Sequence, residues 1–356
     1  MDYRNTLMWK ELNEAPALLQ MIAEKNAPVL ERIVSEVERN KVDFAYTVAR
    51  GTSDHAMLYF KYLAESVLGL PTASGAPSTV TLYGTNLRLQ SALVVACSQS
   101  GRAEDVIEVV KRGRLCGAVT VAITNDEASP LAQIAEFHLC CFTGDEKSVA
   151  ATKTFTAQLF LSLLLVRMLG KRSCNAAKRL GAGLIYGLGQ IDKATDFMST
   201  DFISAEECFI LSRGVSSALA FECALKLQET CYIKARAYHS SDFYHGPMAM
   251  VGNDTKVILF ASRRTLQGAS ETVHREDCIK CARKMQELGA NLYIVTDDAS
   301  LSCEKANIVL LPGGEDEGET AFYFALAAQM LACKVSCGKG LNPDSPRALK
   351  KITITR

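Results

Sequence analysis

The chain has 356 residues, with 39 Lys plus Arg against 39 Asp plus Glu, and 48% of its residues are hydrophobic. This balance gives no overall field that would attract nucleic acid or an anionic membrane, and the most apolar stretch, residues 157–166, is too short to span a bilayer. We therefore expect a cytoplasmic globular protein that binds neither nucleic acid nor a membrane and is long enough for two cores of ordinary size.

The first 24 residues carry the pattern of an amphipathic helix. The apolar residues on one stripe are Leu12, Ala15, Leu18, Leu19 and Ile22. This stripe predicts a helical segment that packs on the body of the protein or on a second subunit.

Three strand-like segments occur twice, in the same order. The paired segments are residues 46–53 with 209–216, 93–98 with 257–262, and 119–125 with 292–298. The offsets of 163, 164 and 173 residues indicate duplication of one α/β unit, and the alternation of apolar runs with helical patterns is typical of covered parallel sheets. The predicted fold is α/β with two tandem doubly wound lobes, at residues 25–190 and 191–345, between the helical segment 1–24 and a tail at 346–356.

In the first lobe, a predicted strand ends in Ser98-Gln99-Ser100-Gly101, and a helical stretch begins near Glu104. Hydroxyls and backbone N–H groups at a helix start can hold a phosphate, although serine is also an ordinary helix cap. A second hydroxyl-rich turn, Gly51-Thr52-Ser53, should end at the same edge of the sheet, where α/β folds bind ligands. The two turns favour a phosphate site, and the absence of a P-loop motif argues against a nucleotide.

In the second lobe, Glu222, Lys226 and Glu229 follow one another at steps of four and three residues, which places them on one face of a helix. His245-Gly246-Pro247 follows sixteen residues later. Such groups can move protons on a small polar substrate. The alternatives are a surface ion pair between Glu222 and Lys226 and a histidine that only caps a turn.

The chain contains 13 cysteines, most of them within apolar segments, which predicts reduced core thiols. Cys278 and Cys281 have the spacing of a zinc knuckle or a redox pair, but no second pair completes a ligand set. We expect neither a metal nor a cofactor.

Taken together, these motifs resemble those of sugar isomerase (SIS) domain proteins, over nearly the whole chain. The similarity extends to the isomerase half of glucosamine-6-phosphate synthase and, more closely, to stand-alone SIS-type glucosamine-6-phosphate deaminases. The motifs are Arg50-Gly51-Thr52-Ser53-Asp54-His55-Ala56, Ser98-Gln99-Ser100-Gly101-Arg102, Glu146-Lys147-Ser148-Val149-Ala150-Ala151-Thr152-Lys153, Ala224-Leu225-Lys226-Leu227 with Glu229, His245-Gly246-Pro247, and Pro346-Arg347 with Lys351.

This resemblance implies a phosphosugar substrate. The residues that would hold its phosphate or line its pocket are Ser98, Gln99, Ser100, Thr52, Ser53, Val149 and Ala151. Where the synthase has Glu-Thr after the Ser-Gln-Ser-Gly turn, this chain has Arg102-Ala103, and Ala151 replaces a serine. The contacts to the substrate are therefore expected to differ.

The resemblance also implies catalytic roles. Glu229 would move the proton between C1 and C2, while Lys226 and Glu222 would position the open sugar chain. His245 would assist ring opening from a neighbouring subunit, which implies a homodimer. Lys351 corresponds to the tail lysine that forms a Schiff base with the ketose in the synthase, so the tail is expected to contribute to the active site.

Met1-Asp2 opens the chain where the synthase carries a glutamine-hydrolysing domain, so we expect the reaction to run toward breakdown. The predicted function is an aminosugar-6-phosphate deaminase/isomerase that converts glucosamine 6-phosphate to fructose 6-phosphate and ammonia. The first alternative is a deglycase that hydrolyses 6-phosphorylated glycated amino acids of the fructosamine or glucoselysine type. A non-catalytic phosphosugar sensor is a more distant alternative.

Overall fold

The computed structural model describes residues 1–172, 176–266 and 268–351. Two compact units account for the chain. The first lobe consists of Glu14–Glu146, Lys153–Gly181 and Lys350–Arg356, and the second of Met1–Asn13, Lys147–Thr152 and Ala182–Leu349. Each unit combines several separate segments of the chain, whereas the sequence predicted continuous lobes. The predicted domain boundaries therefore stay predictions.

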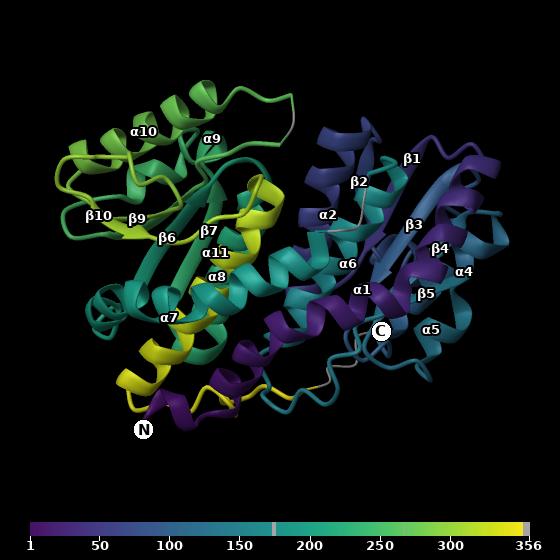
Figure 1. Cartoon of the computed structure of the whole chain (residues 1–356), viewed down its shortest axis with the longest axis horizontal. Helices are drawn as coiled ribbons and strands as arrows, with labels where there is room; N and C mark the ends of the chain where they lie inside the picture. Colours follow the sequence, from purple (N-terminus) through teal and green to yellow (C-terminus); the bar gives the residue numbers. More distant parts are fainter. Residues whose placement is uncertain (173–175, 267, 352–356) are drawn as a thin grey trace. The chain divides into compact units, whose positions relative to one another are not determined.

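The first lobe contains a parallel sheet of order β2-β1-β3-β4-β5 (Figure 1). Its strands are β1 (Phe44–Val48), β2 (Thr72–Ser74), β3 (Ala92–Cys97), β4 (Val119–Thr124) and β5 (Phe137–Cys140). Its helices are α2 (Thr52–Leu68), α3 (Ser78–Thr81), α4 (Glu104–Leu115), α5 (Pro130–Ile134) and α6 (Lys153–Leu169). Helices α2 and α6 pack together on one side, while α4 packs with α5 and against β3 and β4 on the other.

The second lobe repeats this arrangement with the order β10-β9-β8-β6-β7 (Figure 1). Its strands are β6 (Glu207–Ser212), β7 (Lys234–His239), β8 (Lys256–Ala261), β9 (Asn291–Thr296) and β10 (Asn307–Leu310). Its helical segments are η1 (Tyr3–Asn5), η2 (Gly214–Ser216), α8 (Ser217–Cys231), α9 (Ser240–Phe243), η3 (Pro247–Met250), α10 (Glu271–Glu287) and α11 (Glu317–Gly338). The predicted α/β fold with two doubly wound lobes is confirmed.

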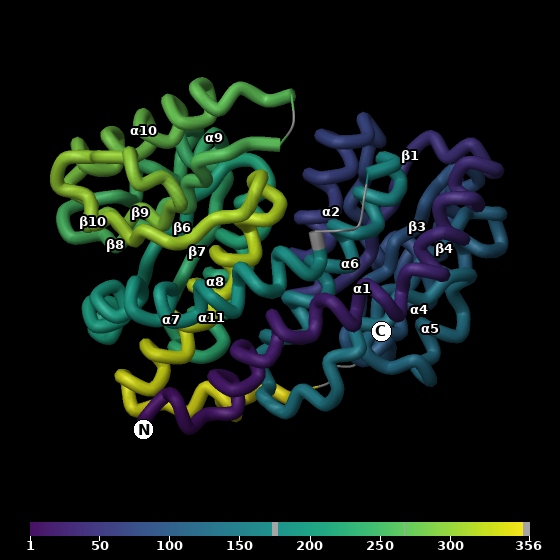
Figure 2. The backbone as a smooth tube through the Cα atoms, viewed as in Figure 1, coloured from purple at the N-terminus to yellow at the C-terminus, as the bar shows by residue number. Residues whose placement is uncertain are grey.

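Two long helices belong to both units. They are α1 (Leu7–Arg39) and α7 (Ala176–Phe202), and their backbones can be followed in Figure 2. Helix α1 continues well beyond the segment 1–24 proposed from its stripe, and it contains Pro16 and Pro28. Its apolar side explains the length, because Leu30 and Ile33 are as buried as Leu12.

Each sheet has an apolar core against one helical layer. In the first lobe, Val94 and Ala96 of β3 pack with Val106 and Val110 of α4. In the second lobe, the corresponding core joins β6, β8 and β9 to α10. Continuous apolar strands of this kind are expected where both faces of a parallel sheet are covered.

Helix α11 is the one described helix that is long and apolar enough to cross a membrane. Within its most apolar window, 94% is buried inside the protein. Helix α11 packs along α8 in the core of the second lobe, and this burial explains its apolar composition.

Candidate functional site

Helix α8 carries the predicted proton-transfer residues on one face. Lys226 and Glu222 are fully buried, and the Lys226 Nζ lies 3.5 Å from Glu222 Oε1 and 2.5 Å from Glu229 Oε2. The side chain of Glu229 is 23% exposed. The alternative of a surface ion pair is therefore wrong, since this lysine is clamped between two carboxylates inside the lobe.

The two carboxylates differ in access, which separates their chemical uses. Glu222 has no exposed surface, so its charge can act only on Lys226 and other buried neighbours. Glu229 keeps a partly open side chain, as a general base must if it is to reach a substrate. A buried ammonium also strengthens the electrostatic effect on any negative charge that develops next to it.

His245 lies in a different part of the second lobe. It follows α9 beyond the carboxyl end of β7, and its side chain is exposed. Glu229 lies in the last turn of α8, just before β7 begins at Lys234, so the two residues lie near opposite ends of β7, whose six residues span about 20 Å. His245 and Glu229 of one chain therefore do not form a proton-transfer pair.

The predicted phosphate turn follows β3 directly. Ser98, Gln99 and Ser100 are all partly exposed, and helix α4 begins at Glu104. Gly101 closes the turn with φ at +61°, and a Cβ there would approach the Ser129 Oγ to 2.2 Å. Only glycine fits this position, so the turn brings its hydroxyls and its backbone to the same edge of the sheet.

Thr52 and Ser53 open α2 at the end of the neighbouring strand β1. The Ser53 Oγ accepts a hydrogen bond from the Gln158 Nε2 at 3.0 Å, and Ser53 is also hydrogen-bonded to the Cys97 thiol. Because Cys97 precedes Ser98, the two hydroxyl-rich turns lie side by side in the first lobe. The juxtaposition is the one expected of strand ends in a parallel sheet.

Val149 and Ala151 belong to the second lobe, in the segment Lys147–Thr152. This segment is held by its backbone. The Glu11 carboxylate accepts from the amides of Lys147 and Ser148, and the Val149 amide donates to the Asp344 carbonyl at 3.1 Å. The side chains of Val149 and Ala151 stay partly exposed, so the backbone anchoring leaves them available to line a pocket.

Lys351 lies in the first lobe, where its Nζ is 2.8 Å from Glu146 Oε2. The same carboxylate oxygen accepts from the Gln99 Nε2 at 2.8 Å. Glu146 therefore links the predicted phosphate turn to the predicted tail lysine, and sequence reasoning gave it no role. Its place in the Glu146-to-Lys153 motif was the available signal, but spacing alone could not identify its partners.

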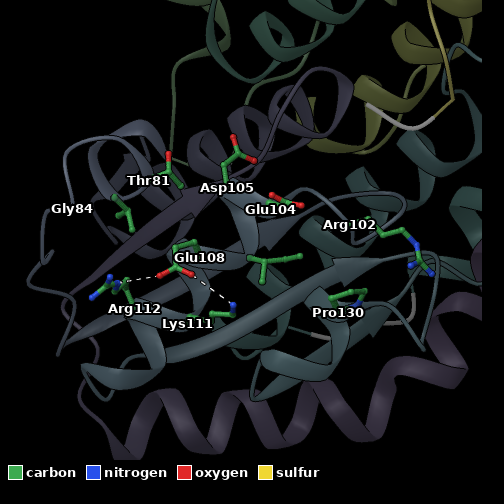
Figure 3. A pocket seen from close by; sticks show the side chains of 11 residues that line it. Thr81, Gly84, Arg102, Glu104, Asp105, Glu108, Lys111, Arg112 and Pro130 are labelled. Carbon is green, nitrogen blue, oxygen red and sulfur yellow. Dashed lines mark hydrogen bonds and ion pairs between the residues drawn. The ribbon is translucent and has the colours of Figure 1, made fainter. Parts of the chain in front are cut away.

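A groove of about 930 Å³ lies beside α3 and α4 of the first lobe (Figure 3). Six charged side chains line it, and at least five of them form ion pairs with one another or with residues outside the lining. The ion pairs are Glu108 with Lys111 and Arg112, Asp105 with Arg50, and Arg102 with Asp126. The Ser98-to-Ser100 turn lies outside its lining, so this groove is not the predicted phosphate site.

Within residues 1–172, 176–266 and 268–351, no cluster of three or more His, Cys, Asp or Glu could hold a metal ion. The cysteines described there are free thiols, and most are buried. Burial raises the pKa of the Cys97 and Cys223 thiols, and it also raises that of Cys278 to about 12. These thiols therefore stay protonated at neutral pH and are poor nucleophiles or metal ligands.

Comparison with known proteins agrees with the fold. Residues 40–168 and 201–337 match the SIS domain model, one match in each lobe and more than half of the chain together. The chain belongs to the SIS domain family. The isomerizing glutamine–fructose-6-phosphate aminotransferase of Photorhabdus laumondii is 30% identical over 366 residues, which cover 98% of this chain and 58% of that protein. The present SIS chain thus spans a little more than half the length of that relative.

Two solved structures resemble this SIS protein over nearly their full length. A putative phosphosugar isomerase from Silicibacter pomeroyi is 30% identical with a TM-score of 0.82, covering 95% of this chain and 100% of that one. A glucosamine-6-phosphate deaminase from Thermotoga maritima is 22% identical with a TM-score of 0.77, covering 98% and 100%. The second similarity shows the fold alone.

Proposed function

We propose that this SIS protein is an aminosugar-6-phosphate deaminase/isomerase with glucosamine 6-phosphate as its substrate. The observation that supports it most is the buried Lys226 between a buried Glu222 and the partly open Glu229. Such a cluster can hold a base beside a fixed positive charge, which is what proton transfer next to a sugar carbonyl requires. The name of the Silicibacter pomeroyi relative also supports phosphosugar chemistry.

In the proposed reaction, the phosphate is held by Ser98, Gln99 and Ser100, with Thr52 and Ser53 beside them. The sugar ring opens to the aldehyde, and Glu229 removes the C2 proton and returns it to C1, while one proton leaves the amine nitrogen and O1 gains one. The product of this transfer is an imine at C2. Water adds to that carbon, the C–N bond breaks, and ketose phosphate and ammonia are released. The positive charge of Lys226 stabilises the negative charge that develops between C1 and C2.

The first test measures ammonia and fructose 6-phosphate released from glucosamine 6-phosphate by the purified protein. Glu229→Gln should lower turnover by about 10³-fold while binding of the phosphosugar persists. Glu207→Gln removes an exposed carboxylate of the same lobe and should leave turnover unchanged. Full activity in Glu229→Gln would refute the assignment of the base.

Parallel assays decide between the alternatives. Release of an amino acid from a 6-phosphorylated glycated amine, with no ammonia from glucosamine 6-phosphate, would replace the deaminase with the deglycase. Binding of phosphosugar without turnover of any of these compounds would indicate a sensor.

We also propose a cytoplasmic homodimer in which His245 serves the partner's Glu229. Two observations support this arrangement. His245 is exposed, and within one chain it lies near the opposite end of β7 from Glu229. Mixing inactive Glu229→Gln and His245→Asn subunits should restore roughly a quarter of the wild-type activity, because half of the dimers would then contain one intact site. Unmixed variants that stay inactive are the control, and no recovery after subunit exchange would exclude the shared site.

A further inference from the structure

Glu146 is a buried glutamate in the segment between β5 and α6 of the first lobe, and only 7% of the residue is exposed. Its Oε2 accepts from the Gln99 Nε2 at 2.8 Å, from the Thr154 Oγ1 at 2.7 Å and from the Lys351 Nζ at 2.8 Å. Its Oε1 accepts from the Thr154 amide at 3.1 Å. One carboxylate therefore connects the turn after β3, the start of α6 and the tail.

The four contacts divide into two pairs with different consequences. Thr154 supplies a backbone amide and a hydroxyl from the start of α6, so it fixes the orientation of the carboxylate. Gln99 and Lys351 belong to segments predicted to meet the substrate, and they are 47 and 205 residues from Glu146. Because an ionised carboxylate can only accept, Gln99 must present its NH₂ group to Glu146, which fixes the direction of its amide.

We propose that Glu146 is a positioning residue that couples the phosphate turn to the tail lysine. This inference rests on the proposed function, because it assigns the turn and the lysine to one phosphosugar. By holding Gln99 and Lys351 on the same oxygen, Glu146 keeps the lysine amine close to the phosphate turn. A misplacement of about 1 Å in such a constellation can reduce turnover by about 10²-fold.

The position of the tail provides a test that needs no activity. Trypsin cleaves after a lysine that can enter its active site, and the ion pair with Glu146 withholds the Lys351 side chain. Glu146→Gln should therefore increase the rate of cleavage after Lys351 about tenfold, followed by mass spectrometry of the intact chain. Glu14→Gln breaks an ion pair with Lys153 in the same lobe and should leave this rate unchanged.

The coupling to the substrate is tested by titration with glucosamine 6-phosphate. Glu146→Gln should weaken binding about tenfold, and Lys351→Gln, a change in the tail that spares the core, should do the same. The double variant should be no worse than either single variant, because both remove one interaction. Glu146→Asp, which keeps the charge, should recover part of the loss, whereas a merely structural role would not follow charge.

The outcomes separate this inference from the proposed function. Unchanged trypsin cleavage in Glu146→Gln, or additive losses in the double variant, would overturn the positioning role. If wild-type protein binds no phosphosugar, the proposed function fails and the link to substrate falls with it, while faster cleavage still establishes that Glu146 holds the tail. If Glu146→Gln does not fold, the effect of Lys351→Gln on binding decides.

Discussion

The turn after β1 and the turn after β6 occupy equivalent places in the two duplicated sheets, and they differ in what faces them. Both contain a glycine with positive φ, 53° at Gly51 and 71° at Gly214. In the first lobe, the Ser53 hydroxyl meets the neutral amide of Gln158. In the second lobe, the Ser216 amide and hydroxyl both donate to Glu317 Oε1, each at 3.1 Å.

Equivalent turns of the duplicated fold therefore have different surroundings in the two lobes. The carboxyl group of Glu317 already accepts from the amide and hydroxyl donors of the second turn, so an external phosphate there would have to compete for the same donors. The first turn faces no such carboxylate from α6, because Gln158 is neutral. In the second lobe the proposed reactive groups lie on α8 instead, with Lys226 between two glutamates.

The largest expected effect concerns the cluster on α8. Lys226→Met keeps the length of the side chain but leaves Glu222 buried without its lysine, and removing one partner of a buried ion pair costs about 3–5 kcal/mol. Urea unfolding should show this loss in the transition of the second lobe. Adding Glu222→Gln to Lys226→Met should recover stability, because no buried charge is then left without a partner. If Lys226→Met alone is as stable as wild type, the cluster is not needed for folding.

The next effect is the dependence of stability on pH that Glu317 confers. Burial raises the pKa of its carboxyl from 4.5 to about 7. Its contribution to stability is therefore fully present below pH 4.5 and is lost as the pH rises through 7, which amounts to about 3 kcal/mol. In Glu317→Gln this loss should disappear, so the variant should gain on wild type between pH 4.5 and pH 8.

Urea titrations at several pH values measure that gain. Glu315→Gln, a change two residues earlier in the chain, is the matched control and should follow wild type. A constant difference between wild type and Glu317→Gln across this range would contradict the assignment.

A smaller effect tests which turn binds phosphate. Ser100→Ala removes one hydroxyl from the first lobe and should raise the Kd for glucosamine 6-phosphate about tenfold, as expected for a hydrogen bond to a charged group. Ser262→Ala makes the same change after β8, the strand equivalent to β3, and should leave the Kd unchanged. Equal losses in calorimetric titrations of the two variants would remove the distinction between the turns.

The smallest effect concerns the surface ion pair between Lys284 and Glu287 on α10. Both side chains are exposed, at 43% and 64%, so Glu287→Gln should cost less than about 1 kcal/mol in urea unfolding. The contrast with Lys226→Met measures how much burial, not spacing, determines the strength of an ion pair. A loss as large as that of Lys226→Met would show that exposure is the wrong criterion.

Much of the fold could be predicted from local pattern. The apolar segments at residues 93–98 and 257–262 became β3 and β8, and Gly51 and Gly214 marked the turns that follow the first strand of each lobe. The roles given to the site residues stay predictions, although Ser98 and Ser53 do lie on adjacent turns. Helix α1 extends beyond the predicted segment 1–24, because its buried apolar stripe continues past Ile22 to Leu30 and Ile33.

The sequence by itself determined the two α/β lobes, the hydroxyl-rich turns and the shared face of Glu222, Lys226 and Glu229, because each of these depends on residues close together in the chain. Tertiary structure alone decided that Lys226 is buried, that Glu146 meets Gln99 and Lys351, and that Glu317 closes the second turn. Spacing fixes the face of a helix on which a side chain lies. What covers that face, and therefore its charge and pKa, depends on segments that are distant in sequence and meet only when the chain folds.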